Sequence, residues 1–491
     1  MRDVVVIGSG LAGLTAAARL AGQGKKVTLV TKGLGGLQLG QGTIDLLGYY
    51  PSPDHDGGAP SRQFVGSPLE LIDSIDKNQD GSDHPYRHFS ADDVRDAVAW
   101  FKGIMGDELV VGDGERNYRL PTAVGALRPT ALPQPTMLQG EPDGRPMVLV
   151  GFDRLKDFYP DLIAENLRRQ TGPDGKPIQA RALHIDLVVD EAEMDTSGIH
   201  FARALDRPET REQLCELLRP LLKDTGRPSP DGSALPQGDP RNLEVVGFPA
   251  VLGLSDRNAF RDIAQRLGHD VFEIPIQPPS VPGMRFNEHL TRMVKAGATS
   301  PEQVALQPGQ TGAPAGEAVR VIVGAPIIGF DVDHQVDEDR LASVTVASAG
   351  HPRKIAAREF ILATGGFESG SLLMDSYGNV SERVFDLPLV GIEGDMIHGD
   401  YWGKDQPLFK AGARVDAQMR PLDADDKPVY SNLHVAGGII AGAVRWREKS
   451  GDGIALVTGL RAADAAGAKV DAAEAKAAGA GSENNNDGGT R

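Results

Sequence analysis

The order of elements at the amino end constrains the fold of this chain more than any other feature. Residues 3–7 (DVVVI) form a β-branched apolar run, residues 14–22 have a helical pattern with small residues, and residues 26–30 (KVTLV) are typical of a second strand. A glycine-rich turn, IGSGLAG, joins the first strand to the helix. A strand, a GxGxxG turn, a helix and a second strand in this order predict a dinucleotide-binding Rossmann unit.

The three glycines of this turn have separate tasks in such a unit. Gly8 permits the tight turn, Gly10 leaves room for a diphosphate, and Gly13 lets the helix lie close to the sheet. The start of the helix offers free N–H groups and the positive end of its dipole to an anion. The alternative is a glycine-rich turn without a ligand. We expect the cofactor to contact Gly8, Ser9, Gly10, Leu11, Ala12 and Gly13.

The second strand ends without the acidic residue that usually binds a ribose. Thr31 and Lys32 stand there instead, and both are candidate cofactor contacts. Lys32 either faces a phosphate or is a solvated surface lysine, and the sequence leaves both open. The fingerprint as a whole recognises an ADP group, which FAD has and FMN lacks, so it favours FAD.

Two later stretches have the pattern of strand ends that approach the same cofactor. Residues 360–367 (FILATGGF) form a buried strand that runs into a turn, and residues 432–460 combine an apolar strand, a glycine-rich loop and an apolar helix. Such a helix can point its N-terminus at a flavin, although an ordinary strand, loop and helix is the alternative. The further candidate contacts are Thr364, Gly365, Gly366, Gly437, Gly438 and Gly453, together with Gly40 and Gly42.

The rest of the chain predicts an α/β fold in which a Rossmann-type FAD/NAD(P)-binding domain with a β-meander carries an inserted second α/β domain. From Ala318 the chain has β-branched runs separated by turn residues, which predict the meander. The expected organisation is a discontinuous flavin-binding domain (1–50 and 318–465), an inserted substrate or partner domain (84–317), a surface loop (51–83) and a disordered tail (466–491).

Charge and cysteine content exclude several classes of function. The formal charge of −17 and the absence of a basic block argue against nucleic-acid binding. Cys215 is the only cysteine, so the chain cannot supply the several thiolates of an iron–sulfur cluster. We predict no metal site. The amino end has no secretory signal and the least charged stretch, 435–444, is too short to span a bilayer, so a cytoplasmic protein is expected.

Several motifs in a fixed order resemble those of anaerobic glycerol-3-phosphate dehydrogenase B subunits, a family within the fumarate-reductase-like flavoproteins. The resemblance extends from Met1 to about Ala463. The motifs are VVVIGSGLAG, GQGTIDLLGY, RLPTAVGALRPTALP, VGFDRLKDF, GFPAVLGL, IPIQPPSVPGMR and FILATGGFESGSL.

The resemblance implies a chain that holds a flavin, assigned as FMN in the family. It implies a catalytic A-type partner and an iron–sulfur C-type partner that passes electrons to membrane quinone, with this chain peripheral at the inner face of the membrane. Glycerol 3-phosphate is the implied substrate. The sequence departs from the family at residues 442–453, where the charged AVRWREKSGDG replaces a loop richer in glycine and apolar residues. The contacts of this loop with the flavin edge and with a partner subunit are therefore expected to differ from those in the family.

No catalytic base stands out from the sequence. Arg128 and Arg285 are candidate anion-binding residues because a guanidinium matches phosphate oxygens, and each is equally well explained as an ion-pair partner. His289 is a weaker candidate base. Besides the redox role, two functions stay open: a noncatalytic flavin-binding assembly role, favoured by the charged 445–449 loop, and a stand-alone FAD-dependent oxidoreductase, disfavoured by the single nucleotide fingerprint.

Overall fold

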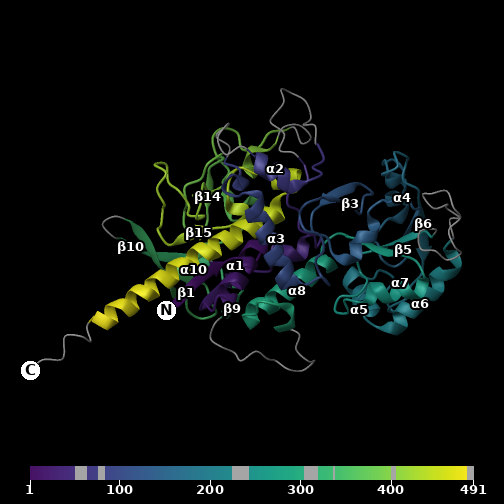
Figure 1. The fold of residues 1–491 in the computed structure, drawn as a ribbon, viewed down its shortest axis with the longest axis horizontal. Helices are drawn as coiled ribbons and strands as arrows, with labels where there is room; N and C mark the ends of the chain where they lie inside the picture. The colour runs from purple at the N-terminus through teal and green to yellow at the C-terminus, as the bar shows by residue number, and fades with distance from the viewer. Residues whose placement is uncertain are drawn as a thin grey trace, which may run out of the picture.

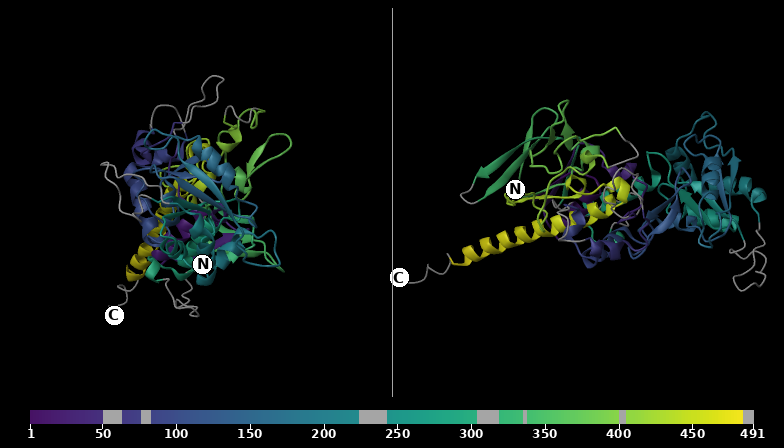
Figure 2. Two further views of the ribbon diagram at one scale, coloured as in Figure 1. Left: turned by 90° about the vertical axis from the view of Figure 1, so that its right-hand side faces the viewer. Right: turned by 90° about the horizontal axis from the view of Figure 1, so that it is seen from above.

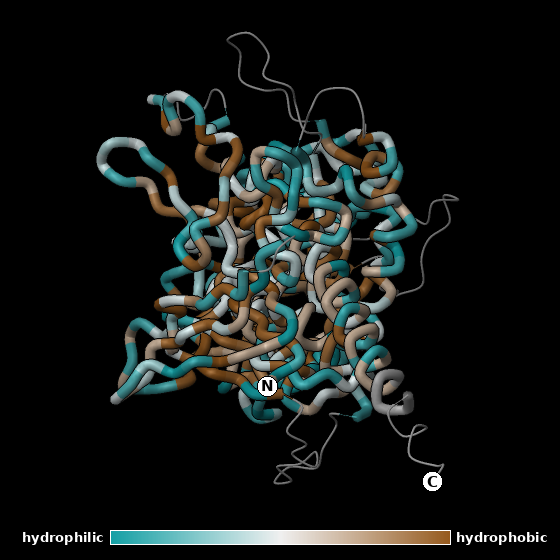
Figure 3. The backbone as a smooth tube through the Cα atoms, turned by 90° about the vertical axis from the view of Figure 1, so that its left-hand side faces the viewer, coloured by the Kyte–Doolittle hydropathy of each residue, from teal (hydrophilic) through white to brown (hydrophobic). Residues whose placement is uncertain are grey.

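The chain folds into two lobes, each with its own hydrophobic core (Figure 1). The computed structural model describes residues 1–49, 63–75, 83–223, 243–303, 319–334, 338–399 and 405–483. The first lobe contains both ends of the described chain, and the second lobe is built around residues 147–281. Hydrophobic segments lie inside the first lobe and hydrophilic loops cover it (Figure 3).

The first lobe is organised around a seven-stranded sheet in the order β10-β11-β12-β1-β2-β9, with β15 also paired to β12. Strands β9, β2, β1, β12 and β15 are parallel neighbours, whereas β10, β11 and β12 form an antiparallel meander. The strand bounds are β1 Arg2–Ile7, β2 Val27–Thr31, β9 Val319–Val323, β10 Ile327–His334, β11 Asp339–Val346, β12 Arg353–Leu362 and β15 Leu433–Val435.

The register brings four strand ends to one edge of this sheet. Ile7 pairs with Val30 of β2 and with Leu362 of β12, and Leu362 in turn pairs with Val435 of β15. Ligands of open parallel sheets bind beyond the carboxyl ends of the strands. The segments that follow these four residues therefore define the edge where a cofactor is expected.

Helices α1 (Leu11–Gly22) and α10 (Gly451–Glu483) pack together beside the sheet. Half of the buried residues of α1 are alanines, whose small side chains allow this close approach. The last described turns of α10 extend beyond the body of the lobe (Figure 2), and residues 471–478 are exposed. Helix α10 contradicts the predicted disordered tail up to Glu483, because alanine, glutamate and lysine sustain a helix without apolar packing. Residues 484–491 lie outside the described residues.

The remaining elements of the first lobe surround the sheet. Helix α3 begins after Ser90, whose Oγ accepts from the Asp93 amide at 3.1 Å while the Asp93 carboxylate accepts from the Ser90 amide at 2.8 Å, so these two residues form a capping box. Helices here are α2 Pro68–Ser74, α3 Ala91–Met105, α8 Val281–Ala296 and α9 Arg445–Glu448, and the short strands are β13 Leu372–Met374 and β14 Val380–Glu382. The hairpin of β3 Tyr118–Pro121 and β4 Leu127–Thr130 instead lies beside the second lobe (Figure 1), where the Val124 carbonyl of its turn accepts from Asn166.

The second lobe is a parallel sheet in the order β6-β5-β7-β8, flanked by helices. Phe152, Phe201 and Phe248 pack together in its core, with the rings of Phe152 and Phe201 4.9 Å apart. The elements are β5 Met147–Phe152, α4 Pro160–Arg168, β6 Ala180–Ile185, α5 Gly198–Leu205, α6 Pro208–Leu218, β7 Val245–Pro249, α7 Ala259–Leu267 and β8 Val271–Ile274.

Three further sequence predictions differ from the fold. Strand β9 is not part of the meander; it pairs in parallel with β2 at the sheet edge, because its half-buried apolar residues continue the parallel layer. The predicted loop 51–83 contains α2, which buries Pro68, Leu69 and Ile72; residues 50–62 and 76–82 lie outside the described residues. Helix α3 and the second half of α8 pack in the first core, although both lie within the range 84–317 predicted as inserted.

None of the described helices is both long enough and apolar enough to cross a membrane.

Candidate functional site

The turn after β1 is packed so tightly that only glycine fits at two of its positions. Gly8 has φ +112°, and a Cβ there would come 2.2 Å from the carbonyl oxygen of Ala363. A Cβ on Gly13 would come 1.9 Å from the carbonyl oxygen of Gly8. The turn is therefore pressed against the end of β12 on one side and against the first turn of α1 on the other.

Gly10 and the start of α1 form the open part of this turn. Among the described residues, a Cβ on Gly10 would have no neighbour within 4 Å. The Leu14 amide donates to the Gly10 carbonyl at 2.9 Å, so the amides of residues 11–13 precede the first intrahelical bond. No described side chain caps the helix, and its first turn carries no acid. The start of α1 thus has the features of an anion-binding helix N-terminus.

Ser9 and Thr31 form a polar pair at the ends of β1 and β2. Their hydroxyl oxygens lie 2.8 Å apart, and the Thr31 hydroxyl also donates to the Gly33 carbonyl at 2.6 Å. Lys32 is exposed. The residues that replace the usual ribose-binding acid are thus a buried hydroxyl held in a local network and a surface lysine.

The segment after β12 contains a buried hydroxyl without a partner. Within the described ranges, Thr364 Oγ1 makes no hydrogen bond although it is shielded from solvent. Buried hydroxyls are normally paired, so this atom indicates a missing ligand or water. Gly365 follows with φ +81° and packs on the side chain of Ser369.

The segment after β15 reaches both α1 and the end of β12. A Cβ on Gly437 would lie 3.0 Å from the Cβ of Ala12, and the Gly437 amide donates to Thr458 Oγ1 at 2.9 Å. A Cβ on Gly438 would lie 3.1 Å from the Gly366 amide nitrogen. The structure therefore brings three predicted glycine segments, 8–13, 364–366 and 437–438, to one edge of the sheet.

Gly40, Gly42 and Gly453 have different environments from those segments. Gly40 is exposed, whereas the Gly42 carbonyl accepts from the buried side chain of Gln134, at 3.0 Å from its Nε2. The Gly453 amide, near the start of α10, donates to the Asp45 carbonyl at 2.9 Å. This part of the α10 N-terminus is therefore already bonded to the chain's own backbone.

Asp45, Arg128 and Asp452 form a charged cluster that the sequence predicts only in part. Arg128 Nε donates to the buried carboxylate of Asp45 at 2.9 Å. Burial and the nearby Asp45 carboxylate, partly offset by Arg128, raise the pKa of Asp452 to about 7. The sequence does contain a signal for the two acids, which is a single acidic residue within a stretch of apolar residues or glycine. Asp45 lies in TIDLL and Asp452 lies in SGDGIA.

Arg128 also faces a small cavity between the two lobes. The lining includes Gln41, Thr43, Thr130 and Glu273. Burial disfavours the charged form of Arg128, but the nearby Asp45 carboxylate raises the pKa of Arg128 above its usual value. The guanidinium is therefore positively charged. Thr130 Oγ1 is buried and has no hydrogen-bond partner in the described part of the chain.

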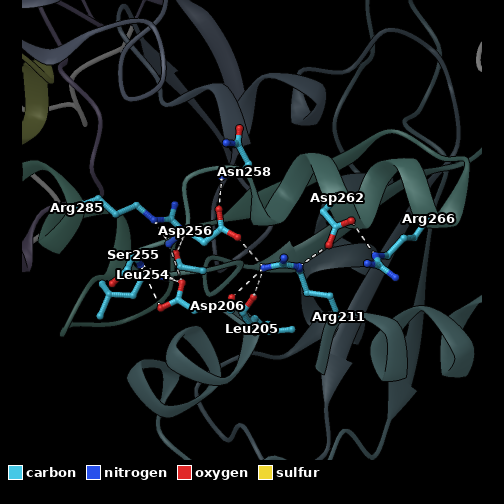
Figure 4. A network of polar contacts seen from close by, with 11 residues as sticks. Leu205, Asp206, Arg211, Leu254, Ser255, Asp256, Asn258, Asp262, Arg266 and Arg285 are labelled. Carbon is cyan, nitrogen blue, oxygen red and sulfur yellow. Dashed lines mark hydrogen bonds and ion pairs between the residues drawn. The ribbon is translucent and has the colours of Figure 1, made fainter. Parts of the chain in front are cut away.

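Arg285, the second candidate, is almost completely buried in a structural network. Its Nη1 lies 2.6 Å from Glu273, and its Nε donates to the Gly253 carbonyl at 3.0 Å. The loop that follows Gly253 is held by Asp206, which accepts from the amides of Leu254 and Ser255 (Figure 4). The guanidinium of Arg285 is thus occupied by protein partners.

His289, the candidate base, is buried against helix α3. Its Nε2 donates to the Ile104 carbonyl at 2.7 Å. Burial lowers the pKa of His289, and the positive charge of Arg292 acts in the same direction. The imidazole is therefore neutral and bonded to the backbone of α3, which is a structural role.

The charged loop that departs from the family is folded tightly against the lobe. Glu448 is buried and accepts from Ser450 Oγ at 2.8 Å and from the Val444 amide at 2.9 Å, while His84 lies 3.2 Å away. Burial alone would raise the pKa of Glu448, but these hydrogen bonds lower it. The Glu448 carbonyl accepts from the Gly48 amide, which ties the loop to the segment around Asp45.

The fold and this edge define the class of protein, and comparison with known families agrees. A family model described as "FAD binding domain" matches residues 3–454. The chain belongs to this family of FAD-binding flavoproteins and, within it, groups with the anaerobic glycerol-3-phosphate dehydrogenase B subunits, as the sequence resemblance predicted.

Two relatives support that grouping. The probable B subunit of the anaerobic glycerol-3-phosphate dehydrogenase of Halobacterium salinarum is 31% identical over 469 residues, covering 94% of this chain and 97% of the relative. The B subunit of the same enzyme from Pectobacterium carotovorum subsp. carotovorum is 28% identical over 478 residues, with the same coverage of 94% and 97%.

Among solved structures, 3-ketosteroid delta1-dehydrogenase from Sterolibacterium denitrificans matches 95% of this chain and 99% of its own, at 13% identity and a TM-score of 0.39. This distant likeness carries no argument about function.

The described residues fit a bound FAD in three respects. Among the described residues, a Cβ on Gly10 would meet no atom within 4 Å, the first amides of α1 lack intrahelical acceptors, and Thr364 Oγ1 is buried without a partner. A diphosphate would satisfy the amides and a flavin nucleotide would satisfy the hydroxyl.

Proposed function

We propose that this chain is the flavin-holding component of a glycerol-3-phosphate dehydrogenase complex and that its flavin is FAD. The observation that carries the proposal is the convergence of the uncapped start of α1, Thr364 Oγ1 and the glycines after β15 at one sheet edge. The Rossmann turn would hold the diphosphate, which FMN lacks. When bound, the flavin supplies a hydride acceptor that releases electrons one at a time.

The substrate proposal rests on the names of the relatives, which are glycerol-3-phosphate dehydrogenase subunits. Of the three sequence candidates, Arg128 is the one we assign to the phosphate, because it lines a cavity in addition to its pairing with Asp45, whereas the polar atoms of Arg285 and His289 are directed only at protein partners. The complex would then oxidise the alcohol of glycerol 3-phosphate to the ketone of dihydroxyacetone phosphate.

The electrons would leave through partner subunits. The single cysteine cannot ligate an iron–sulfur cluster, so a C-type partner would carry the clusters and deliver electrons to quinone, alongside an A-type flavoprotein. The relatives are named as one component of such an enzyme. The complex would then hold this chain at the inner face of the membrane.

The test is an anaerobic titration of the purified chain with glycerol 3-phosphate, alone and with its partner subunits. We expect the visible absorbance of the oxidised flavin to bleach, because reduction removes the oxidised chromophore. The Arg128→Gln variant should need more substrate for the same bleaching, whereas Arg353→Gln, an exposed control on β12, should not.

A noncatalytic assembly role is the second candidate, and the departure of the charged 445–449 loop from the family's glycine-rich loop favours it. A Cβ on Gly366 would meet Arg445 Nη2 at 2.6 Å, so this arginine lies against the segment that would hold the flavin. A flavin that stays oxidised with substrate and all partners present would support this role over the catalytic one.

A further inference from the structure

Arg445 lies where two segments of the cofactor edge meet. Its Nη2 would be 2.6 Å from a Cβ on Gly366 and 3.3 Å from a Cβ on Gly438. These glycines follow β12 and β15, and β12 is the strand next to the Rossmann turn. The guanidinium therefore covers the carboxyl ends of two parallel strands.

The stem of Arg445 is fixed at the start of α10. Its Cβ, Cγ and Cδ would lie 3.4–3.9 Å from a Cβ on Gly451, the first residue of that helix. The Arg445 carbonyl accepts from the Ser450 amide at 3.3 Å, and buried Glu448 holds the turn of α9. The side chain is 13% exposed, so it is not a free surface arginine.

The counter-ion of Arg445 leaves much of this guanidinium available. Nη2 donates to Glu368 Oε1 at 2.7 Å. A guanidinium has five N–H donors, so a single carboxylate oxygen does not saturate it. The Glu368 side chain is 48% exposed, and ion pairs with a half-exposed partner are weak because water screens them. A second anion can therefore share or replace Glu368 at small cost.

We propose that Arg445 contacts the flavin and stabilises the negative charge of its reduced form, with Glu368 as the counter-ion that weakens this effect. This role depends on the proposed flavin site. In this role, the charged loop at residues 445–449 places a fixed cation at the cofactor edge. The cation raises the reduction potential of the flavin.

The experiment measures flavin affinity and midpoint potential in the full chain. In the Arg445→Gln variant, the ratio of the affinity for reduced flavin to the affinity for oxidised flavin should be about tenfold smaller than in wild type. This change lowers a two-electron midpoint potential by about 30 mV. Arg445→Lys should recover part of the shift, and Glu368→Gln should raise the potential. Arg353→Gln is the matched control for loss of one positive charge and should leave both quantities unchanged.

An unchanged potential in a flavin-loaded Arg445→Gln protein overturns the inference while leaving the proposed function intact. A wild-type chain that binds no flavin overturns both. If Arg445→Gln does not fold, Glu368→Gln decides the matter, because a potential that fails to rise is incompatible with a counter-ion role.

Discussion

Gly8 lies against the backbone of Ala363 with no room for a side chain between them. A Cβ on Gly8 would approach the Ala363 carbonyl oxygen to 2.2 Å and the Thr364 nitrogen to 3.1 Å. This contact joins the end of β1 to the end of β12, so the turn expected to hold the diphosphate and the unpaired hydroxyl of Thr364 are fixed relative to each other.

Substitution of Gly8 by alanine should therefore damage the fold and the flavin site together. The positive φ and the contact with Ala363 should cost about 1–3 kcal/mol or more in unfolding free energy. Denaturant unfolding and flavin content measure the two effects. Gly329→Ala, at a glycine with open space in β10, is the control. A Gly8→Ala protein as stable as that control would contradict the geometry.

Substitution of Gly10 should separate ligand binding from folding. An alanine Cβ there meets nothing described within 4 Å and the backbone has φ −71°, so the flavin-free protein should keep its stability within about 0.5 kcal/mol. The same Cβ projects into the space assigned to the diphosphate, so flavin affinity should fall substantially. Unchanged affinity in a fluorescence titration would place the ligand elsewhere.

Thr364→Val should stabilise the flavin-free chain slightly and weaken flavin binding. The substitution removes a buried hydroxyl that has no partner among the described residues, while a lost hydrogen bond to the ligand corresponds to about 0.5–1.5 kcal/mol. Thr28→Val, at another such hydroxyl within β2, is the matched control and should not change affinity. Equal affinities for the two variants would count against a contact between Thr364 and flavin.

Asp452 should make stability depend on pH in a defined direction. Its pKa of about 7 is above the ordinary value of 3.8, so between these pH values the folded chain keeps a proton that the unfolded chain releases. The contribution of Asp452 to stability therefore falls as pH rises from about 4 to 7, by roughly 2–4 kcal/mol in total.

The check on Asp452 compares unfolding curves of wild type and Asp452→Asn across this pH range. The amide cannot ionise, so the variant should gain stability relative to wild type as pH rises. If the unfolding free energies of the two proteins change with pH in the same way, the Asp452 carboxyl is not the source of the pH dependence.

The sequence is sufficient for the Rossmann unit because its signals are local. Residues 3–30 contain the strand, turn and helix pattern in order, and Ser90 caps its helix through a residue three positions away. The partner of β9 is not predictable in this way, since parallel pairing with β2 joins segments almost 300 residues apart. Low hydrophobicity at the carboxyl end suggests disorder, but the helix propensity of the same residues explains the length of α10.

The glycine segments of the site are predictable from the sequence, but the environments of the charged candidate residues are not. Arg128 and Arg285 have the same side chain, yet one faces a cavity and the other is enclosed by Glu273 and Gly253. That distinction depends on tertiary contacts. Asp45 and Asp452 come together from segments about 400 residues apart, so only the fold shows that they share a site.

The most direct test is to release the chromophore from the purified chain by denaturation and identify it by chromatography with FAD and FMN standards. We predict FAD in an equimolar ratio to the chain, because the start of α1 is built for a diphosphate. FMN alone, or no flavin from a correctly folded protein, would contradict this prediction.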